Sequence, residues 1–170
     1  EIVGKLMPTG GKGYDVVFMS AQFVEAMNQL GLLAELDESK IPNLANLYPE
    51  ARNLAFDPGN KHSAPYAWGT TGLCYRSDIV TTAPTSWNDL LQPADPLKKR
   101  VTMLSTDRWL MAAGLKSLGY SVNSTNPDEI AQAKAVLIAA NPNLLAYDDT
   151  TFYSKLLSGD ADLVHAWDGG

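Results

Sequence analysis

One stretch of the chain reads Ala64–Pro65–Tyr66–Ala67–Trp68–Gly69–Thr70–Thr71–Gly72–Leu73–Cys74–Tyr75. It starts with proline and aromatic residues, passes two glycines and ends in a β-prone apolar run at Leu73–Tyr75. Glycine gives the backbone freedom to change direction, and an apolar β-prone run is typical of a strand that enters a packed sheet. We therefore expect a crossover between two packed units at about residues 66–75, with Cys74 buried in the first strand beyond it.

Composition limits the classes of protein to which the chain can belong. Its 170 residues are 45% hydrophobic and 19% charged, which is enough apolar material for a core. No apolar run approaches the roughly 20 residues that a membrane-spanning helix needs. A net charge of −6 argues against nucleic acid or anionic lipid as a partner and favours a cationic ligand. Mild acidity also serves solubility, so this alternative stays open.

The two ends of the sequence lack the features of natural termini. The chain begins with Glu1–Ile2–Val3 rather than methionine, shows no signal peptide, and reaches Gly169–Gly170 directly after a strand pattern. We expect that both ends are cut from a longer protein. The single cysteine cannot form a disulfide within the chain, so it does not indicate a redox compartment.

Before the crossover, one segment has the pattern of a strand followed by a helix. Tyr14–Met19 is a continuous β-prone run and predicts a strand buried on both faces. Ser20 follows as a candidate helix N-cap, and apolar residues then recur at helical spacing until Gly31. The segment predicts half of a βαβ unit.

After the crossover, short apolar runs alternate with helical patterns. We expect helices at about 85–91, 108–118, 127–140 and 151–157, and strands at 101–104, 144–147 and 162–167. Gly119 and Gly159 fit the positions that end helices. This alternation predicts an α/β fold with a mostly parallel sheet.

Polar side chains follow the predicted strands at their carboxyl ends, where open α/β sheets bind ligands. These turns are Ser20–Gln22, Ser105–Asp107, Asp148–Thr150 and Trp167–Asp168. Together they would form a polar pocket with an aromatic wall. Two plainer interpretations stay open: Ser20 and Thr106 serve only as helix caps, and Asp148 and Asp149 form a solvated turn.

Signatures of enzymes, metal sites and cofactor sites are poor. The sequence has no nucleophile elbow, phosphate-binding loop, dinucleotide fingerprint or zinc-binding helix motif, so we expect no cofactor. His165 lies inside a strand pattern, which favours a hydrogen-bonded structural role. Asp160 and Asp162 lack the wider calcium-loop pattern, so we expect no metal there. An α/β enzyme that uses Asp107 or the Asp148–Asp149 pair is the alternative from another class.

Several short motifs, in this order and spacing, resemble the spermidine/putrescine-binding proteins of bacterial ABC importers. They are Gly13–Tyr14–Asp15–Val16–Val17–Phe18–Met19–Ser20, Pro65–Tyr66–Ala67–Trp68–Gly69–Thr70, Thr85–Ser86–Trp87–Asn88–Asp89–Leu90, Leu118–Gly119–Tyr120–Ser121 and Ala166–Trp167–Asp168–Gly169. The resemblance runs over nearly the whole chain, and the joint order of the motifs carries it.

The resemblance implies a periplasmic-binding-protein-like two-lobe fold, incomplete here, that binds solute in a cleft and performs no catalysis. Residues 1–69 would be part of lobe one and residues 70–170 most of lobe two. The hinge would lie at Trp68, Gly69 and Thr70, with Tyr66 and Trp68 near the cleft mouth. It also implies a periplasmic location and a membrane permease as partner. Unpaired sheet edges would favour an edge-strand dimer of the chain.

Contacts carried over from the family are Ser20 and Gln22 in lobe one. In lobe two they are Asp149 or its neighbour Asp148, then Asp168 and Trp167, whose ring would pack on the aliphatic part of a polyamine.

In the stretch that corresponds to Ser105–Trp109, the family usually has two ligand-binding acids. This chain has Thr106 and Trp109 at those two positions, and Asp107 is displaced by one. A cation–π contact with Trp109, worth roughly 0.5–2 kcal/mol, would not fully replace a carboxylate. A metal chelate, a thiamine-like compound or an amino-bearing osmolyte therefore stays open as the ligand, and so does a chain that by itself binds nothing.

Overall fold

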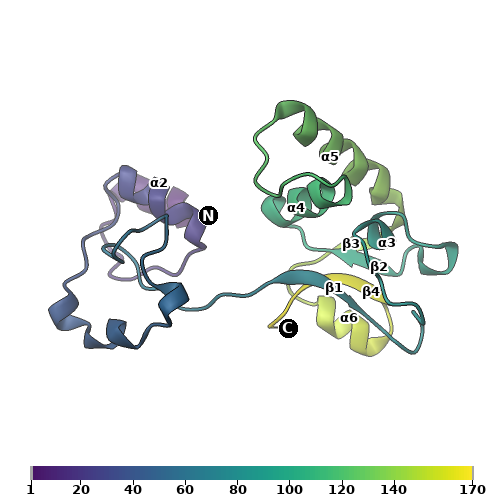
Figure 1. The fold of residues 1–170 in the computed structure, drawn as a ribbon, viewed down its shortest axis with the longest axis horizontal. Coiled ribbons are helices and arrows are strands. Elements are labelled where there is room, and N and C mark those ends of the chain that lie inside the picture. The colour runs from purple at the N-terminus through teal and green to yellow at the C-terminus, as the bar shows by residue number, and fades with distance from the viewer. Residues whose placement is uncertain (1, 170) are drawn as a thin grey trace. The chain divides into compact units, whose positions relative to one another are not determined.

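The computed structural model describes residues 2–169, and it divides the chain into two compact units at the boundary between Trp68 and Gly69. We call residues 1–68 unit 1 and residues 69–170 unit 2, and describe each by itself (Figure 1).

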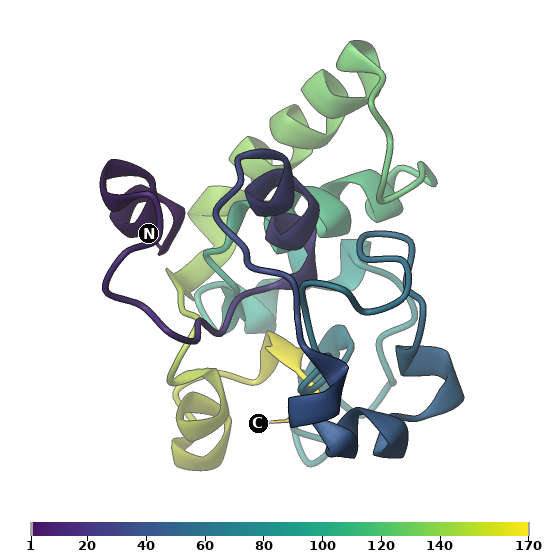
Figure 2. The same ribbon diagram turned by 90° about the vertical axis from the view of Figure 1, so that its left-hand side faces the viewer.

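Unit 1 consists of short helices and turns joined by loops (Figure 2). Its α-helices are α1 (Ile2–Leu6) and α2 (Val24–Gln29), and its 3₁₀ turns are Met7–Thr9, Ala21–Phe23, Glu38–Lys40, Pro42–Asn46 and Pro49–Ala51. Prolines in three of these turns sit at first or second positions, where the missing N–H costs nothing. Leu6, Val24 and Met27 are the buried apolar residues described in this unit.

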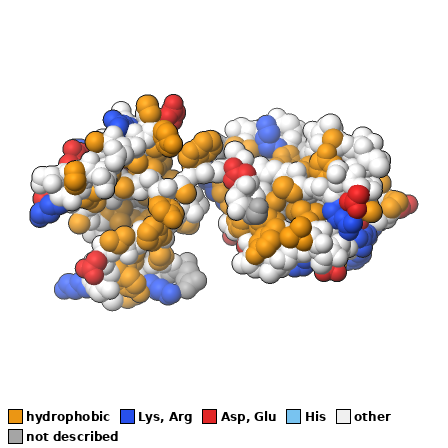
Figure 3. Space-filling view, turned by 90° about the horizontal axis from the view of Figure 1, so that it is seen from below, with side chains coloured by type: hydrophobic (Ala, Val, Ile, Leu, Met, Phe, Trp, Pro, Cys, Tyr) orange, Lys and Arg blue, Asp and Glu red, His pale blue; other side chains and the backbone are white. Residues whose placement is uncertain are grey.

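The predicted buried strand at Tyr14–Met19 is wrong. The segment is irregular, pairs with no strand among residues 2–169, and leaves Val16 76% and Phe18 70% exposed. A strand is stabilised by hydrogen bonds to a neighbour, so an apolar pattern alone cannot form one. Hydrophobic side chains are accordingly visible over much of the surface of unit 1, on the left of the space-filling view (Figure 3).

One loop of unit 1 is fixed by a buried carboxylate. Asp57 is 4% exposed and accepts hydrogen bonds from the backbone N–H groups of His62 and Ser63 and from the Ser63 hydroxyl. Burial alone would raise the pKa of Asp57, but these bonds hold it below its usual value. The charge is therefore used to order the loop.

Unit 2 is built on a four-stranded sheet with the order β1-β4-β2-β3. The strands are β1 (Thr71–Tyr75), β2 (Val101–Met103), β3 (Leu144–Tyr147) and β4 (Leu163–Trp167). Strand β2 pairs in parallel with β3 and β4, whereas β1 runs antiparallel to β4. The predicted α/β fold with a mostly parallel sheet is confirmed.

Helices cover both faces of this sheet. Helices α4 and α5 lie on one face and α6 lies on the other (Figure 1). Their bounds are α3 (Asn88–Leu91), α4 (Asp107–Ser117), α5 (Pro127–Ala140) and α6 (Phe152–Ser158), with 3₁₀ turns at Asp95–Leu97 and Asn141–Asn143. Each face has its own apolar cluster, one around Val101 and Leu163 and the other around Phe152 and Val164. Gly119 and Gly159, both with positive φ, follow α4 and α6 as the sequence predicts.

The predicted burial of Cys74 is wrong, because the thiol is exposed. Strand β1 is an edge strand, and Cys74 lies opposite Val164, on the face that α6 covers. Leu73, on the other face, packs against the larger cluster. At an edge strand, helix cover on one face does not ensure burial.

The predicted hydrogen-bonded role of His165 is also wrong. The side chain is fully buried in β4, and neither ring nitrogen has a hydrogen-bond partner among the described residues. Its ring packs edge-on against Trp87, with 4.7 Å between centroids. Burial lowers the pKa of His165 to about 4, although the charge of Asp149 opposes the shift. The imidazole is therefore neutral near pH 7.

Among the helices described between residues 2 and 169, none has the length and apolar composition needed to cross a membrane.

Candidate ligand-binding site

The carboxyl ends of β2, β3 and β4 meet at one edge of the sheet because these strands are parallel. The start of β1 lies there as well, since Thr71 is opposite Trp167 in the antiparallel pair. We call this the carboxyl edge, and it consists of Gly69–Thr71, Ser105–Trp109, Asp148–Thr150 and Trp167–Asp168. It includes six of the predicted ligand-binding residues.

Asp149 ties two turns of the carboxyl edge together. Its carboxylate accepts a 2.8 Å hydrogen bond from the Ser105 N–H, another from the Ser105 hydroxyl, and a 3.3 Å hydrogen bond from the Thr106 hydroxyl. Thr106 occupies the N-cap position of α4, but its side chain makes no capping bond. Neither plain interpretation therefore holds here: Thr106 bonds Asp149 instead of capping α4, and Asp149 is more than a solvated turn residue.

The Asp148 carboxylate is hydrogen-bonded by residues that follow it closely in the sequence. It accepts hydrogen bonds from the backbone of Thr150 and Thr151, from the Thr151 hydroxyl and from the ammonium group of Lys155. Burial alone would raise the pKa of Asp148, but the Lys155 ammonium and these hydrogen bonds lower it far below its ordinary value. Its charge is neutralised within the fold.

Asp168 binds the segment that leads into β1. Its Oδ2 accepts hydrogen bonds from the Thr70 N–H at 2.9 Å and from the Thr70 hydroxyl at 3.2 Å. The Asp168 N–H donates in return to the Thr70 carbonyl oxygen at 3.1 Å.

Aromatic rings flank these polar groups. Trp167 packs edge-on against Phe152, with 5.9 Å between centroids, and both rings contact the apolar cluster under α6. Trp109 packs against the same cluster from α4, and the Arg108 guanidinium lies 5.9 Å from the centroid of its ring. Both indoles are only partly buried, so each keeps ring surface for a ligand.

The charge of the carboxyl edge is left uncompensated. Asp107, Asp149 and Asp168 form no ion pair with a cationic side chain among residues 2–169, unlike Asp148 with Lys155. Asp107 stands in the first turn of α4 and is exposed. Within the same residues, no cluster of three acidic, cysteine or histidine side chains could hold a metal ion.

The two predicted contacts in unit 1 have a different setting. Ser20 precedes the Ala21–Phe23 turn without a side-chain capping bond, and it lines a shallow cavity of about 210 Å³ with apolar neighbours such as Phe18 and Phe23. Gln22 is exposed. The structure describes these two residues within unit 1 alone, so their role as contacts stays a prediction.

Two residues of the carboxyl-edge network escaped prediction from the sequence. Phe152 supports Trp167, and Lys155 neutralises Asp148. The spacing of Thr151 and Lys155, one helical turn apart, is a signal that could have indicated the second of these contacts. The first contact joins segments distant in sequence and left no such signal.

A family model for bacterial extracellular solute-binding proteins matches residues 1–170. The chain belongs to this family.

Curated relatives of the solute-binding family include proteins named for polyamines. The chain is 34% identical over 172 residues to the putrescine/cadaverine-binding protein of Pseudomonas aeruginosa, covering 98% of this chain and 48% of the relative. It is 35% identical over 157 residues to the spermidine/putrescine-binding periplasmic protein of Salmonella typhimurium, covering 92% and 44%. The chain thus spans about half the length of the curated relatives it matches.

Solved structures of related proteins resemble this chain closely. One is a putative spermidine/putrescine ABC transporter protein from Listeria monocytogenes, with a TM-score of 0.88, 32% identity, and coverage of 99% of this chain and 52% of that one. Another is the TpPotD lipoprotein of Treponema pallidum, with a TM-score of 0.85, 32% identity, and coverage of 97% and 53%. The predicted periplasmic-binding-protein-like fold is confirmed by these matches.

Proposed function

We propose that this chain is part of a periplasmic solute-binding protein that captures a polyamine or a related amine and delivers it to the membrane permease of an ABC importer. Family membership supports the solute-binding role, and the polyamine names of relatives 34–35% identical support the class of ligand. The protein would carry out no chemistry on its solute.

The observation that carries the proposal is the uncompensated negative charge beside two indole rings at the carboxyl edge. Ammonium groups bind carboxylates through charge-assisted hydrogen bonds, worth about 1.5–3 kcal/mol each. Methylene groups between them pack on aromatic faces, which also attract cations. Trp167 and Trp109 would supply the rings, and Asp107 and Asp149 the charge.

The remaining predicted contacts complete the proposed ligand set. The Thr106 hydroxyl can accept a hydrogen bond from an ammonium group while it donates to Asp149. Ser20 and Gln22 would contribute from unit 1, while Asp168, whose carboxylate accepts hydrogen bonds from Thr70, would support the neighbouring Trp167. Binding would shift the population toward the form that the permease recognises, with Trp68, Gly69 and Thr70 proposed as the hinge.

The competing enzyme hypothesis needs a carboxyl group that exchanges protons near neutral pH. Asp148 does not meet this need, because its lowered pKa keeps it ionised. Asp149 accepts hydrogen bonds from the Ser105 N–H and the Thr106 hydroxyl, so its oxygens serve as acceptors in the fold. The geometry therefore favours binding over acid–base catalysis.

The direct test is calorimetry of the intact protein with putrescine, cadaverine and spermidine. We expect a saturable heat of binding, and no heat with any of the three would overturn the polyamine proposal. A thermal-shift panel that adds a metal chelate, thiamine and a small amino-bearing osmolyte separates the neighbouring specificities. Ligand at 100 times its dissociation constant stabilises the protein by about 2.7 kcal/mol. We therefore expect the class of compound that the protein binds to raise its melting temperature, and the other classes to leave it unchanged.

A further inference from the structure

The strongest unexplained feature is the tight junction between Asp168 and the segment that enters β1. Three hydrogen bonds connect Asp168 and Thr70, two of them to a single carboxylate oxygen, although the residues are 98 positions apart. Asp168 directly follows Trp167, the last residue of β4, and Thr70 directly precedes β1. These hydrogen bonds therefore join the end of β4, which carries Trp167, to the segment that leads into β1.

Gly69 is required by the same junction. A Cβ atom added at Gly69 would lie less than 3.0 Å from the Asp168 Oδ1, which is closer than real Cβ atoms approach other atoms. The backbone of Gly69 does not adopt a positive φ, so the need for glycine comes from the carboxylate and not from the local conformation. Both carboxylate oxygens of Asp168 thus face the residues 69–70.

We propose that Asp168 is a positioning residue, which holds Gly69–Thr70 in place through its acceptor oxygens, and that its charge is not the partner of the solute's ammonium group. The part that concerns the solute rests on the proposed function. An ammonium group would have to compete with the two Thr70 donors for Oδ2, whereas Asp107 stands exposed in the first turn of α4. Asp168 instead couples the position of Trp167 to the segment that joins the two units.

The first test needs no solute. Amide hydrogen exchange of Thr70 is measured by NMR in the intact protein, in Asp168→Asn and in Asp168→Ala. Asparagine keeps one acceptor oxygen, so we expect exchange within threefold of the wild type. Alanine removes the acceptor, and we expect exchange at least tenfold faster. An unchanged rate in Asp168→Ala would overturn the proposal.

The second test is a double-mutant cycle with Gly69→Ala. We expect Gly69→Ala to speed exchange of the Thr70 amide at least fivefold in the wild type, because the new methyl group displaces the carboxylate. In the Asp168→Ala background the same change should add less than twofold, since the obstructing group is gone. Equal effects in both backgrounds would overturn the assignment.

The third test separates position from charge, with putrescine as the probe. We expect Asp168→Asn to bind putrescine within threefold of the wild-type Kd, and Asp168→Ala to bind at least tenfold more weakly. A loss above tenfold in Asp168→Asn, with Thr70 exchange unchanged, would overturn the positioning role and assign the charge to the solute. If the wild type itself does not bind putrescine, the proposed function fails, while the exchange experiments still decide the role of Asp168.

Discussion

The two ends of the sheet in unit 2 both carry aspartates, but they differ in how these carboxylates are paired with cations. At the amino edge, which we define as Arg76, Arg100 and Gly159–Asp162, Asp162 is 1% exposed and lies between two arginines. At the carboxyl edge, Asp148 pairs with Lys155, whereas Asp107, Asp149 and Asp168 lack a cationic partner among residues 2–169. Charge therefore serves the fold at the amino edge, while part of it stays available for a solute at the carboxyl edge.

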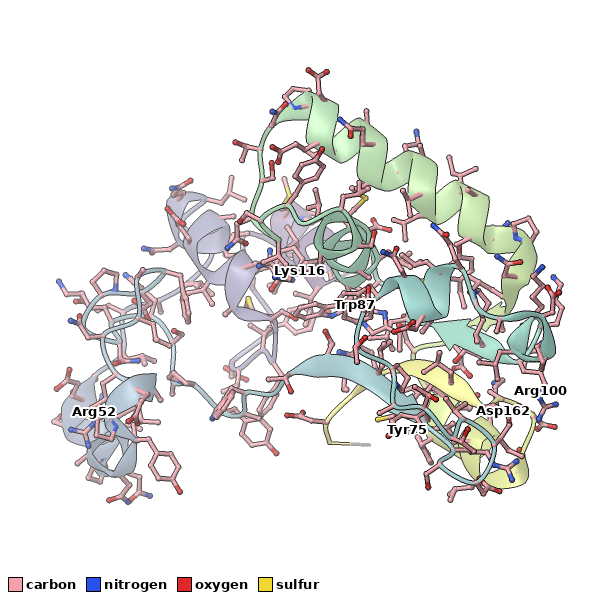
Figure 4. All side chains as sticks on the ribbon, turned by 45° about the vertical axis from the view of Figure 1, so that its right-hand side comes forward. Arg52, Tyr75, Trp87, Arg100, Lys116 and Asp162 are labelled. Atoms are coloured by element: carbon pink, nitrogen blue, oxygen red, sulfur yellow. The ribbon has the colours of Figure 1, made fainter. Side chains whose placement is uncertain are left out.

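The amino edge is a closed network. The Arg100 guanidinium binds the Asp162 carboxylate through Nε and Nη2 and also donates to the Gly159 carbonyl oxygen, while Arg76 lies 3.7 Å from the same carboxylate. Arg100 and Asp162 lie side by side in the stick view (Figure 4). Hydrogen bonding to Asp162 raises the pKa of Arg100, so the guanidinium stays charged. The network thereby connects the residue that follows β1 with the residues that precede β2 and β4.

The largest expected effect comes from breaking the amino edge. Asp162→Asn should lower the free energy of unfolding by about 3 kcal/mol, because it leaves two arginines without their shared buried partner. Urea unfolding measures the change. The matched control is Asp160→Asn, an exposed acid two residues away that binds the Ser158 hydroxyl, and it should change stability by less than about 0.5 kcal/mol. Similar losses of unfolding free energy in both variants would show that the ion pairs of Asp162 have no special weight at the amino edge.

The next effect concerns His165, which lies between the two edges. Its folded pKa of about 4 is below the usual 6.5, so the unfolded chain binds the proton more tightly. Its contribution to stability is complete above pH 6.5 and is lost as pH falls toward 4, by about 2 kcal/mol at pH 5. Urea unfolding between pH 7.5 and 4.5 measures this loss.

His165→Leu should flatten that pH dependence, because the leucine side chain does not titrate. Asp149→Asn removes the charge that raises the pKa of His165, so it should steepen the dependence slightly. An unchanged pH profile in His165→Leu would show that the loss comes from other groups.

A smaller effect tests the aromatic part of the carboxyl edge. Trp167→Leu should weaken putrescine binding about tenfold, since it removes a cation–π and stacking surface worth roughly 1–2 kcal/mol. The matched control is Tyr153→Leu, which removes another ring that packs edge-on against Phe152 but stands on the exposed side of α6. Calorimetry should show an unchanged Kd for the control, and equal losses would remove the special role of Trp167.

The smallest expected effect separates the attraction of Asp107 for a cationic solute from its interaction with the N-terminus of α4. Asp107→Asn should raise the Kd for putrescine about fivefold at low salt, and less at high salt, because exposed charges are screened. It should cost about 0.5 kcal/mol of stability through the N-terminus of α4. Asp128→Asn makes the same change in the first turn of α5 and should alter stability alone. A weaker affinity in both variants would assign the effect to overall charge.

Local signals predicted much of unit 2. Asn126 caps α5 by accepting a hydrogen bond from the Asp128 N–H, and proline stands at the first turn, so the predicted start and end of α5 match the structure. Strand β3 also has the predicted bounds, Leu144–Tyr147. These elements depend on periodicity, capping and glycine stops, which are properties of short stretches of sequence.

The failures share one cause, which is dependence on a neighbour. Tyr14–Met19 has the composition of a buried strand, yet it needs a hydrogen-bonded partner that residues 2–169 do not provide. Cys74 has a buried pattern but lies in an edge strand, and His165 is buried without the hydrogen bonds that its polarity demands. None of these outcomes is encoded within a few residues of the position concerned.

By itself, the sequence determined the α/β alternation, the helix ends of unit 2 and the placing of Trp109, Asp149 and Trp167 near the carboxyl ends of strands. It also carried the family resemblance. Only the tertiary structure decided which acids keep their charge available, because that depends on contacts such as Lys155 with Asp148 and Thr70 with Asp168. Charge compensation is a property of pairs brought together by folding, whereas the tendency to form a helix or strand belongs largely to the local chain.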